Sequence, residues 1–192
     1  MSTRTDRTEL VGDGMVGDLA RAALFAALLG AFSYVAFPYP FSPAPVTLQV
    51  LGVFLAGLLL GPVWGFAACG LYLVAGALGA PVFAGGAAGL GVLLGPTAGY
   101  LLSTPLGAAV IGGVAYGRSP VAPESVSIVR LVVALLVGTI AIYVCGVLGF
   151  VVVQQLSPVE AFLTGGAAFL PAEALKIAAA VGIVRSDALT TE

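Results

Sequence analysis

Long apolar runs, separated by short breaks rich in proline, glycine or charge, dominate the chain. About 20 apolar residues cross a hydrocarbon core ~30 Å thick, and prolines, glycines and charges mark helix ends. The pattern therefore predicts an all-α integral membrane protein with six transmembrane helices. We expect these over residues 17–37, 46–60, 62–79, about 95 to 117, 128–154 and 165–184, with a loop over 155–164.

The predicted helices form one transmembrane domain, residues 17–184, between a solvated N-terminal tail, residues 1–16, and a polar C-terminal tail, residues 185–192. Acidic residues precede the first apolar run, and no small-residue cleavage site follows it. Secretory signals have the opposite features. We therefore expect the first apolar run to remain in the protein as a helix.

The composition excludes a soluble globule. Hydrophobic residues make up 60% of the 192 residues and charged residues only 8%, with a mean hydropathy of +1.13, whereas soluble domains carry about 25% charged residues. The chain has no His and two Cys, so we expect no disulfide framework, no catalytic residue and no metal site. The net charge of −2 gives no basic surface for nucleic acid.

Six of the seven basic residues lie on one side of the predicted topology, and the seventh, Lys176, lies within a predicted helix. That side holds Arg4, Arg7, Arg21, Arg118, Arg130 and Arg185. On the other side, the Pro-rich loop after the first helix, the Gly-rich loop and the loop around Glu160 carry no Lys or Arg. Since basic residues stay inside, we expect a multi-pass protein of the cytoplasmic membrane with both termini in the cytoplasm.

The Gly-rich segment over residues 80–91 is apolar, yet it contains too many glycines for a helix that faces lipid. Irregular backbone at membrane depth is tolerated only where protein or a cavity covers it. We therefore expect this segment to cap a substrate site from outside. The alternative is a flexible outer loop.

Glu173 and Lys176 lie within the last predicted helix, three residues apart and hence on one face. A charge inside the membrane costs about 2.5–3.5 kcal/mol, so both should face the bundle interior. We expect Lys176 to bind a ligand carboxylate and Glu173 to accept from ligand N–H groups, with Pro171 breaking the helix just outside them. The alternative is a structural ion pair.

Other features leave two interpretations open. Thr47 and Gln49 at the start of the second helix, and Tyr143 in the fifth, are candidate ligand contacts, although single polar residues often bond a neighbouring helix. Small residues recur along the first helix, at Ala22, Ala23, Ala26, Ala27 and Gly30. Such rows permit close helix contact, either within the bundle or with a partner. No Walker motif is present, so ATP-driven work needs another chain.

Five motifs resemble the BioY family, over about residues 20–184. They are PVTLQ at 45–49, GAPVFAGG at 79–86, GPTAGY at 95–100, Ile142-Tyr143, and Pro171 with Lys176. The resemblance implies the biotin-specific S component of an energy-coupling-factor (ECF) transporter. It implies substrate binding by Thr47, Gln49, Phe83, Gly85, Gly86, Tyr143, Glu173 and Lys176.

The same resemblance implies the partners. They are a transmembrane coupling subunit of the EcfT or BioN kind, docked on Ala22, Ala23, Ala26 and Ala27, ATPase subunits of the EcfA or BioM kind, and membrane lipid. Biotin is then the transported ligand, and no cofactor is expected. The family usually has Asp at the place of Glu173, and some members have Asn where Gly85 and Gly86 stand.

Three alternatives remain from the sequence. The chain could be an S component for another vitamin, such as thiamin or riboflavin, although a flavin would require more stacking aromatic residues. It could be an intramembrane enzyme that uses Glu173 and Lys176 as acid and base. It could also be a purely structural membrane subunit.

Overall fold

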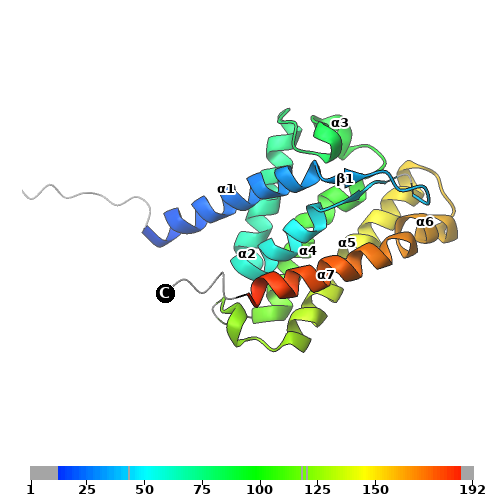
Figure 1. The fold of residues 1–192 in the computed structure, drawn as a ribbon. Coiled ribbons are helices and arrows are strands. Elements are labelled where there is room, and N and C mark those ends of the chain that lie inside the picture. Colours follow the sequence, from blue (N-terminus) through cyan, green and yellow to red (C-terminus); the bar gives the residue numbers. More distant parts are fainter. Residues whose placement is uncertain (1–12, 43, 118, 120, 187–192) are drawn as a thin grey trace, which may run out of the picture.

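The computed structural model is helical apart from one small hairpin, and it describes residues 13–42, 44–117, 119 and 121–186 (Figure 1). The elements are α1 (Asp13–Ser33), β1 (Ala36–Phe37), β2 (Val46–Thr47), α2 (Gln49–Ala77), α3 (Leu90–Leu93), α4 (Ala98–Tyr116), α5 (Ile128–Val153), α6 (Pro158–Gly165) and α7 (Leu170–Val184). Short 3-10 turns lie at Ala84–Gly86, Pro123–Ser125 and Ala167–Phe169. Within the described residues, five helical stretches, with α6 and α7 taken together, are long and apolar enough to cross a membrane. The predicted all-helical membrane fold is confirmed.

Helix α2 bends sharply at the Gly-Pro step where the sequence predicts a turn between two helices. Gly61 has φ 75° and ψ −174°, a conformation that glycine adopts without steric cost. A Cβ on Gly65 would lie 3.0 Å from the carbonyl oxygen of Ala56. The two arms of α2 therefore fold back against each other.

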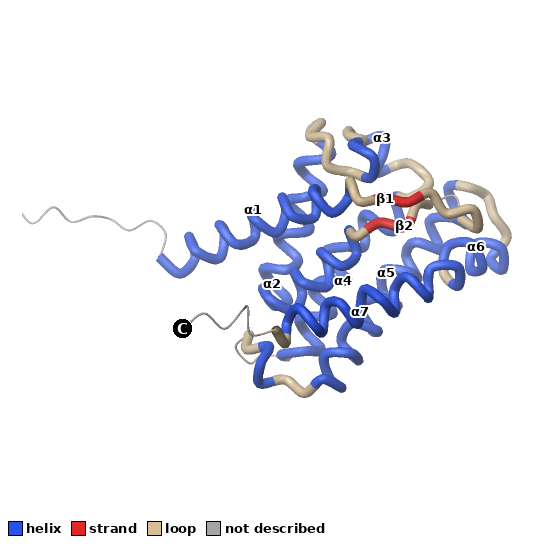
Figure 2. The backbone as a smooth tube through the Cα atoms, viewed as in Figure 1, coloured by secondary structure: helices blue, strands red, loops and turns tan. Residues whose placement is uncertain are grey.

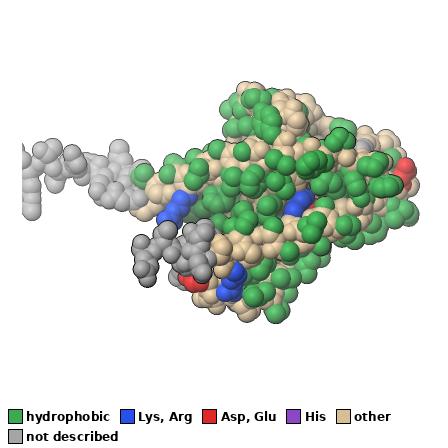
Figure 3. All heavy atoms as spheres, in the orientation of Figure 1, with side chains coloured by type: hydrophobic (Ala, Val, Ile, Leu, Met, Phe, Trp, Pro, Cys, Tyr) green, Lys and Arg blue, Asp and Glu red, His purple; other side chains and the backbone are tan. Residues whose placement is uncertain are grey.

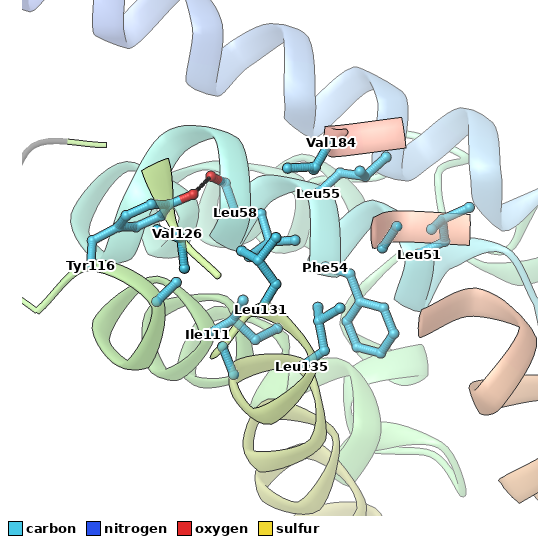
Figure 4. Packing of buried hydrophobic residues seen from close by; sticks show 13 residues of the cluster. Leu51, Phe54, Leu55, Leu58, Ile111, Tyr116, Val126, Leu131, Leu135 and Val184 are labelled. Carbon is cyan, nitrogen blue, oxygen red and sulfur yellow. Dashed lines mark hydrogen bonds between the residues drawn. The ribbon is translucent and has the colours of Figure 1, made fainter. Parts of the chain in front are cut away.

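The proline after this bend leaves a backbone acceptor without its helical donor. A helical N–H bonds the carbonyl four residues earlier, and Pro62 has no N–H, so the carbonyl of Leu58 needs another donor. The hydroxyl of Tyr116, the last residue of α4, donates to it (Figure 4). This bond ties the bend of α2 to α4.

The largest core cluster lies between α2, α4, α5 and α7, and Figure 4 shows its side chains pointing toward one another. It comprises Leu51, Phe54, Leu55, Leu58, Ile111, Ala115, Tyr116, Val126, Leu131, Ala134, Leu135, Ala180 and Val184. A second cluster joins α1, α2, α4, α5 and the Gly-rich segment through Leu29, Val53, Ala56, Cys69, Tyr72, Phe83, Leu101, Ala108 and Ile142. In a membrane such contacts stabilise helix association by van der Waals packing.

The two ends of the bundle carry different structures (Figures 1 and 2). The antiparallel pair β1–β2, in which Ala36 lies opposite Thr47, is at one end together with α3 and α6. The connection between α4 and α5 and the C-terminal end of α7 are at the opposite end. The N-terminal part of α1 projects away from the other helices.

The two helix ends that flank the Pro-rich segment differ from the predicted ones. The sequence predicts a helix that reaches Phe37 and another that begins at Val46, but α1 ends at Ser33 and α2 begins at Gln49. A residue that precedes proline is driven toward extended conformations, and Phe37 precedes Pro38. The segment therefore forms the hairpin instead of extending the helices.

The predicted loop over residues 155–164 is wrong, because it contains α6. The hydroxyl of Ser157 accepts a hydrogen bond from the N–H of Glu160, and Pro158 lies in the first turn; both features are typical of a helix start. Pro171 also lies in the first turn of its helix. It therefore begins α7, whereas the sequence analysis expects it to break a helix.

Smaller differences concern other boundaries. Helix α1 begins at Asp13 and overlaps the predicted tail 1–16; α2 ends at Ala77 rather than 79, α4 begins at Ala98 rather than near 95, and α3 has no counterpart in the prediction. Residues 1–12 and 187–192 of the two predicted tails lie outside the described residues.

The molecular surface is mainly apolar on the face drawn in Figure 3, where charged side chains appear at only a few places. Large hydrophobic side chains are exposed on each long helix; Val63, Leu102, Val129 and Leu175, for example, are 71%, 54%, 73% and 74% exposed. A contiguous apolar surface of this kind on a soluble protein would promote association. It suits a chain whose helices contact lipid.

Candidate functional site

A cavity of about 300 Å³ lies between the residues that lead into α2, the Gly-rich segment, α4, α5 and α7. This volume lies at the small end of the range for ligand sites in proteins. Its walls are mostly apolar, with polar groups contributed by Thr47, Gln49, Thr97, Tyr100, Thr104, Tyr143, Glu173 and Lys176. An apolar cavity with few polar groups is typical of a small-molecule site.

Two charged residues of α7 form the most polar part of the cavity wall. The ammonium of Lys176 donates to Oε1 of Glu173 at 2.7 Å, and the two residues are only 6% and 2% exposed. The hydroxyl of Tyr143, on α5, donates to the same Oε1 at 2.9 Å. We refer to Glu173 and Lys176 as the charged pair.

The two carboxylate oxygens of Glu173 differ in their hydrogen bonding. Oε2 is buried and has no hydrogen-bond partner within the described part of the chain. Leaving a buried acceptor unpaired costs about 1–3 kcal/mol, and more when it is charged. The ammonium of Lys176 has three donor hydrogens, of which Glu173 occupies one. The charged pair therefore offers an acceptor and donors side by side.

The separation within the charged pair limits what it can bind. Because the two charged groups are 2.7 Å apart, one polar end of a ligand meets both of them. This differs from the sequence prediction that Lys176 and Glu173 recognise two different groups of an extended ligand. The pair also has no net charge, so a neutral group that both donates and accepts matches it better than an anion.

The fold positions the charged pair through the start of α7. Glu173 lies in the first turn of this helix, where the helix dipole stabilises a carboxylate. The spacing of three residues places Lys176 on the same face. Tyr143 approaches from α5 and donates to Oε1, so Oε2 is the oxygen that has no hydrogen bond among the described residues.

An aromatic wall, formed by Tyr100, Tyr143 and Phe169, adjoins the charged pair. The rings of Tyr100 and Tyr143 meet edge to face with their centroids 5.7 Å apart, and the ring centroid of Phe169 lies 6.2 Å from that of Tyr143. The Tyr100 hydroxyl donates to the carbonyl of Gly165 at 2.6 Å. Tyr100 and Phe169 are not among the residues predicted for the site, although Tyr100 ends the GPTAGY motif and could have been proposed from it.

The cavity includes both polar candidates from the start of the second predicted helix. Thr47, in β2, and Gln49, the first residue of α2, line it, and Thr47 Oγ1 accepts from the backbone N–H of Gln49 at 3.3 Å. Thr97 and Thr104, which the sequence analysis missed, line the cavity from α4 and the residue before it. A lone threonine in an apolar run, such as Thr104, gives no signal of its own, whereas Thr97 belongs to the GPTAGY motif.

The Gly-rich segment lines the cavity with different residues from those predicted. Phe83 contributes to the wall as expected, but Ala84 and Ala87 do so in place of Gly85 and Gly86. Gly85 and Gly86 have φ of 69° and 79°, which favour glycine. They form the turn of the segment and are not among the residues that line the cavity.

The small residues of α1 divide into two rows. Ala22 is fully buried beside Leu60, and Ala26 is half-buried. Ala23 and Ala27 are exposed. The first row therefore packs α1 within the protein, and only the second is open to a partner.

Comparisons with known proteins identify similar chains. The model of the BioY family matches residues 2–190. The "Biotin transporter BioY" of Rhodobacter capsulatus is 40% identical over 163 residues, which are 80% of this chain and 84% of that protein. The "Probable biotin transporter BioY" of Pyrococcus horikoshii is 35% identical over 164 residues, 85% of this chain and 91% of that one.

A solved structure has a similar fold. It is a crystal structure at 2.1 Å of the S-component for biotin from an ECF-type ABC transporter. The TM-score is 0.82 at 26% sequence identity, and the alignment covers 92% of this chain and 93% of the other.

Proposed function

Because this chain belongs to the BioY family, we propose that it is the membrane S component that binds biotin for uptake by an ECF-type ABC transporter. The observation that carries this proposal is the buried charged pair in the wall of a small apolar cavity, with Glu173 Oε2 unpaired among the described residues. The family is a transporter component rather than an enzyme. The charged pair is therefore assigned to ligand binding instead of acid–base catalysis.

Biotin binds with its ureido ring at the charged pair. The ring carries N–H donors for Glu173 Oε2 and a carbonyl oxygen that accepts from Lys176. A ligand carboxylate at this place would compete with Glu173 for Lys176 and would meet the negative charge of Oε2. The carboxylate of biotin therefore points away from the pair, and its thiophane ring and valeryl chain lie against the apolar walls.

The remaining predicted contacts surround the ligand. Thr47, Gln49 and Phe83 contact biotin from the cavity wall, as do Tyr100 and Tyr143. Biotin is the cargo, and the residues that line the cavity need no cofactor to bind it. Gly85 and Gly86 act indirectly, through the shape of the Gly-rich segment.

The chain crosses the membrane six times with both termini in the cytoplasm. The bend of α2 at Gly61 supports this count, because its two arms fold back on each other and cross separately. The orientation is supported by Arg185, whose guanidinium donates to the carbonyls of Glu124 and Val126. This basic end is opposite the end that carries the Gly-rich segment, in agreement with the positive-inside rule.

The coupling subunit of the transporter docks on the exposed row of α1, formed by Ala23 and Ala27. Small side chains let another helix approach closely. Only 17% of the residues in an apolar 18-residue stretch of α1 are buried inside the protein. This helix therefore has an open face. Energy comes from ATPase subunits bound to the coupling subunit.

Binding of labelled biotin to the purified, detergent-solubilised chain tests the proposal. We expect saturable binding of one biotin per chain, a rise in melting temperature with biotin, and neither effect with thiamin or riboflavin. The absence of any thermal shift with biotin, or a chemical change in the recovered ligand, would contradict the assignment.

A further inference from the structure

The C-terminal end of α1 and the residue that follows it contact the Gly-rich segment. The hydroxyl of Ser33 lies 2.6 Å from the carbonyl oxygen of Val82, and the hydroxyl of Tyr34 donates to the carbonyl of Pro81 at 2.5 Å. A Cβ on Gly30 would lie 3.2 Å from the side chain of Val82, so Val82 sits in the notch that this glycine leaves. We call Gly30, Ser33 and Tyr34 the α1 clasp.

The clasp holds the residue next to Val82 in the cavity wall. Phe83 is 1% exposed, lines the cavity and meets the ring of Tyr72 edge to face at 5.4 Å. Its ring occupies the space above Gly76, where a Cβ would lie 2.2 Å from it. At its far end the segment is held by the N–H of Gly89, which donates to the carbonyl of Gly76 at 2.7 Å.

The hydrogen bonds of the clasp can be given up at low cost. Ser33 has a second acceptor, the carbonyl of Gly30 at 2.7 Å, and one hydroxyl hydrogen serves only one acceptor at a time. When the segment moves away, this hydroxyl therefore remains hydrogen-bonded within α1. Tyr34 is 56% exposed, so its hydroxyl can bond water instead.

Phe83 lacks such a replacement. It leaves a closely fitting apolar site when the segment opens, and van der Waals contacts weaken steeply once a gap forms. The segment is thus held shut by one buried aromatic ring and by hydrogen bonds that exchange readily. This combination suits a part that opens and closes.

We propose that Ser33 and Tyr34 are positioning residues that set the rate at which the ligand enters and leaves the cavity. They act through Phe83, by holding the Gly-rich segment closed over the site. The inference rests on the proposed binding of biotin. Weakening the clasp makes the Gly-rich segment open more often, both with and without ligand. The association and dissociation rates of the ligand therefore both increase, while its affinity changes little.

The test measures biotin exchange on the full-length protein in lipid nanodiscs. Wild type, Tyr34→Phe, Ser33→Ala and the double variant are loaded with labelled biotin and then chased with unlabelled biotin. Tyr34→Phe should dissociate about fivefold faster, the factor that corresponds to one net hydrogen bond of about 1 kcal/mol. Ser33→Ala alone should accelerate dissociation less, because the Ser33 hydroxyl also has the carbonyl of Gly30 as an acceptor. Association should rise in parallel, with the dissociation constant within about twofold of wild type.

Tyr116→Phe is the matched control. It also removes a hydroxyl-to-carbonyl hydrogen bond, but at the opposite end of the bundle, at the bend of α2. We expect it to lower the melting temperature of the ligand-free protein and to leave both exchange rates unchanged. Tyr34→Phe should raise both exchange rates and leave the melting temperature of the ligand-free protein unchanged, because its ring is exposed.

Two results would overturn the inference about the clasp. One is an unchanged dissociation rate in Tyr34→Phe and in the double variant. The other is an acceleration that Tyr116→Phe shares in proportion to lost stability. If the wild-type protein binds no biotin at all, the proposed function fails as well, and the two failures are thereby distinguished.

Discussion

At the scale of single residues, Glu173 connects the sequence to the proposed chemistry. One of its oxygens accepts from both Lys176 and Tyr143, and the other has no partner in the described part of the chain. An acidic and a basic residue three apart in an apolar helix predict a functional pair. The participation of Tyr143, 30 positions earlier, could be predicted only as one candidate among several, because spacing along a helix says nothing about contacts between helices.

Variants of Glu173 test its role as an acceptor. Glu173→Gln keeps an acceptor oxygen but loses the charge, so biotin affinity should fall by about 1–2 kcal/mol. Glu173→Ala leaves donors of the ligand unpaired, so it should weaken biotin binding by about 2–5 kcal/mol. Glu173→Asp, the residue usual in the family, should bind within about tenfold of wild type.

Calorimetric affinity and the melting temperature of the ligand-free variants are measured together. If Glu173 is only the partner of Lys176, Glu173→Gln leaves a buried unpaired cation and lowers the ligand-free stability. Unchanged affinity in a variant that has lost stability would rule out the acceptor role.

Lys176→Gln tests the other half of the pair. It removes the charged donor to the ureido oxygen and leaves Glu173 uncompensated, so binding should weaken by about 2–5 kcal/mol. Because the carboxylate of biotin lies elsewhere, biotin and its carboxamide should lose the same amount of binding affinity. A loss confined to biotin, measured in parallel titrations, would place the carboxylate at Lys176.

At the scale of elements, apolar runs predicted the long helices well. Most elements that were predicted wrongly lie in short segments that contain prolines or polar residues. The start of α6 is encoded by Ser157 and Pro158, within a segment whose polarity indicated a loop. The hairpin β1–β2 replaces helix ends, since prolines favour extended backbone. Which residues of the Gly-rich segment face the cavity depends on its turn, and sequence periodicity does not describe that turn.

The two rows of α1 should respond differently to added bulk. Leucine at both Ala23 and Ala27 should preserve biotin binding but abolish ATP-driven uptake, because larger side chains separate α1 from the coupling subunit. Leucine at both Ala22 and Ala26 should instead lower stability and expression, since Ala22 is fully buried. Uptake in cells and binding to purified protein are compared. Normal uptake with the first pair of substitutions would refute docking on this face.

At the scale of the whole molecule, hydropathy predicted a membrane protein and the order of its helices, but not which helices meet around the cavity. The site combines the entry to α2, the Gly-rich segment, α4, α5 and α7. A single sequence does not contain this arrangement in readable form, because apolar helices in lipid lack the polar and apolar faces that orient helices in water.

Membrane orientation can be tested by labelling single cysteines in a variant without Cys69 and Cys145. Cysteine at Glu160, exposed on α6, should react with an impermeant maleimide in intact cells. Cysteine at Glu124, exposed in the connection between α4 and α5, should react only after permeabilisation. The opposite pattern would invert the topology, and equal labelling at both positions would contradict a crossing by α5, which lies between them.

The most direct test of the central claim is a calorimetric titration of the wild-type protein with biotin and with its carboxamide. We predict one binding site per chain for both, with affinities within about tenfold, because the ureido ring occupies the charged pair in each case. Absence of biotin binding would contradict the assigned function. Tight binding of biotin with none of the carboxamide would contradict the placement of the ureido ring at Glu173 and Lys176.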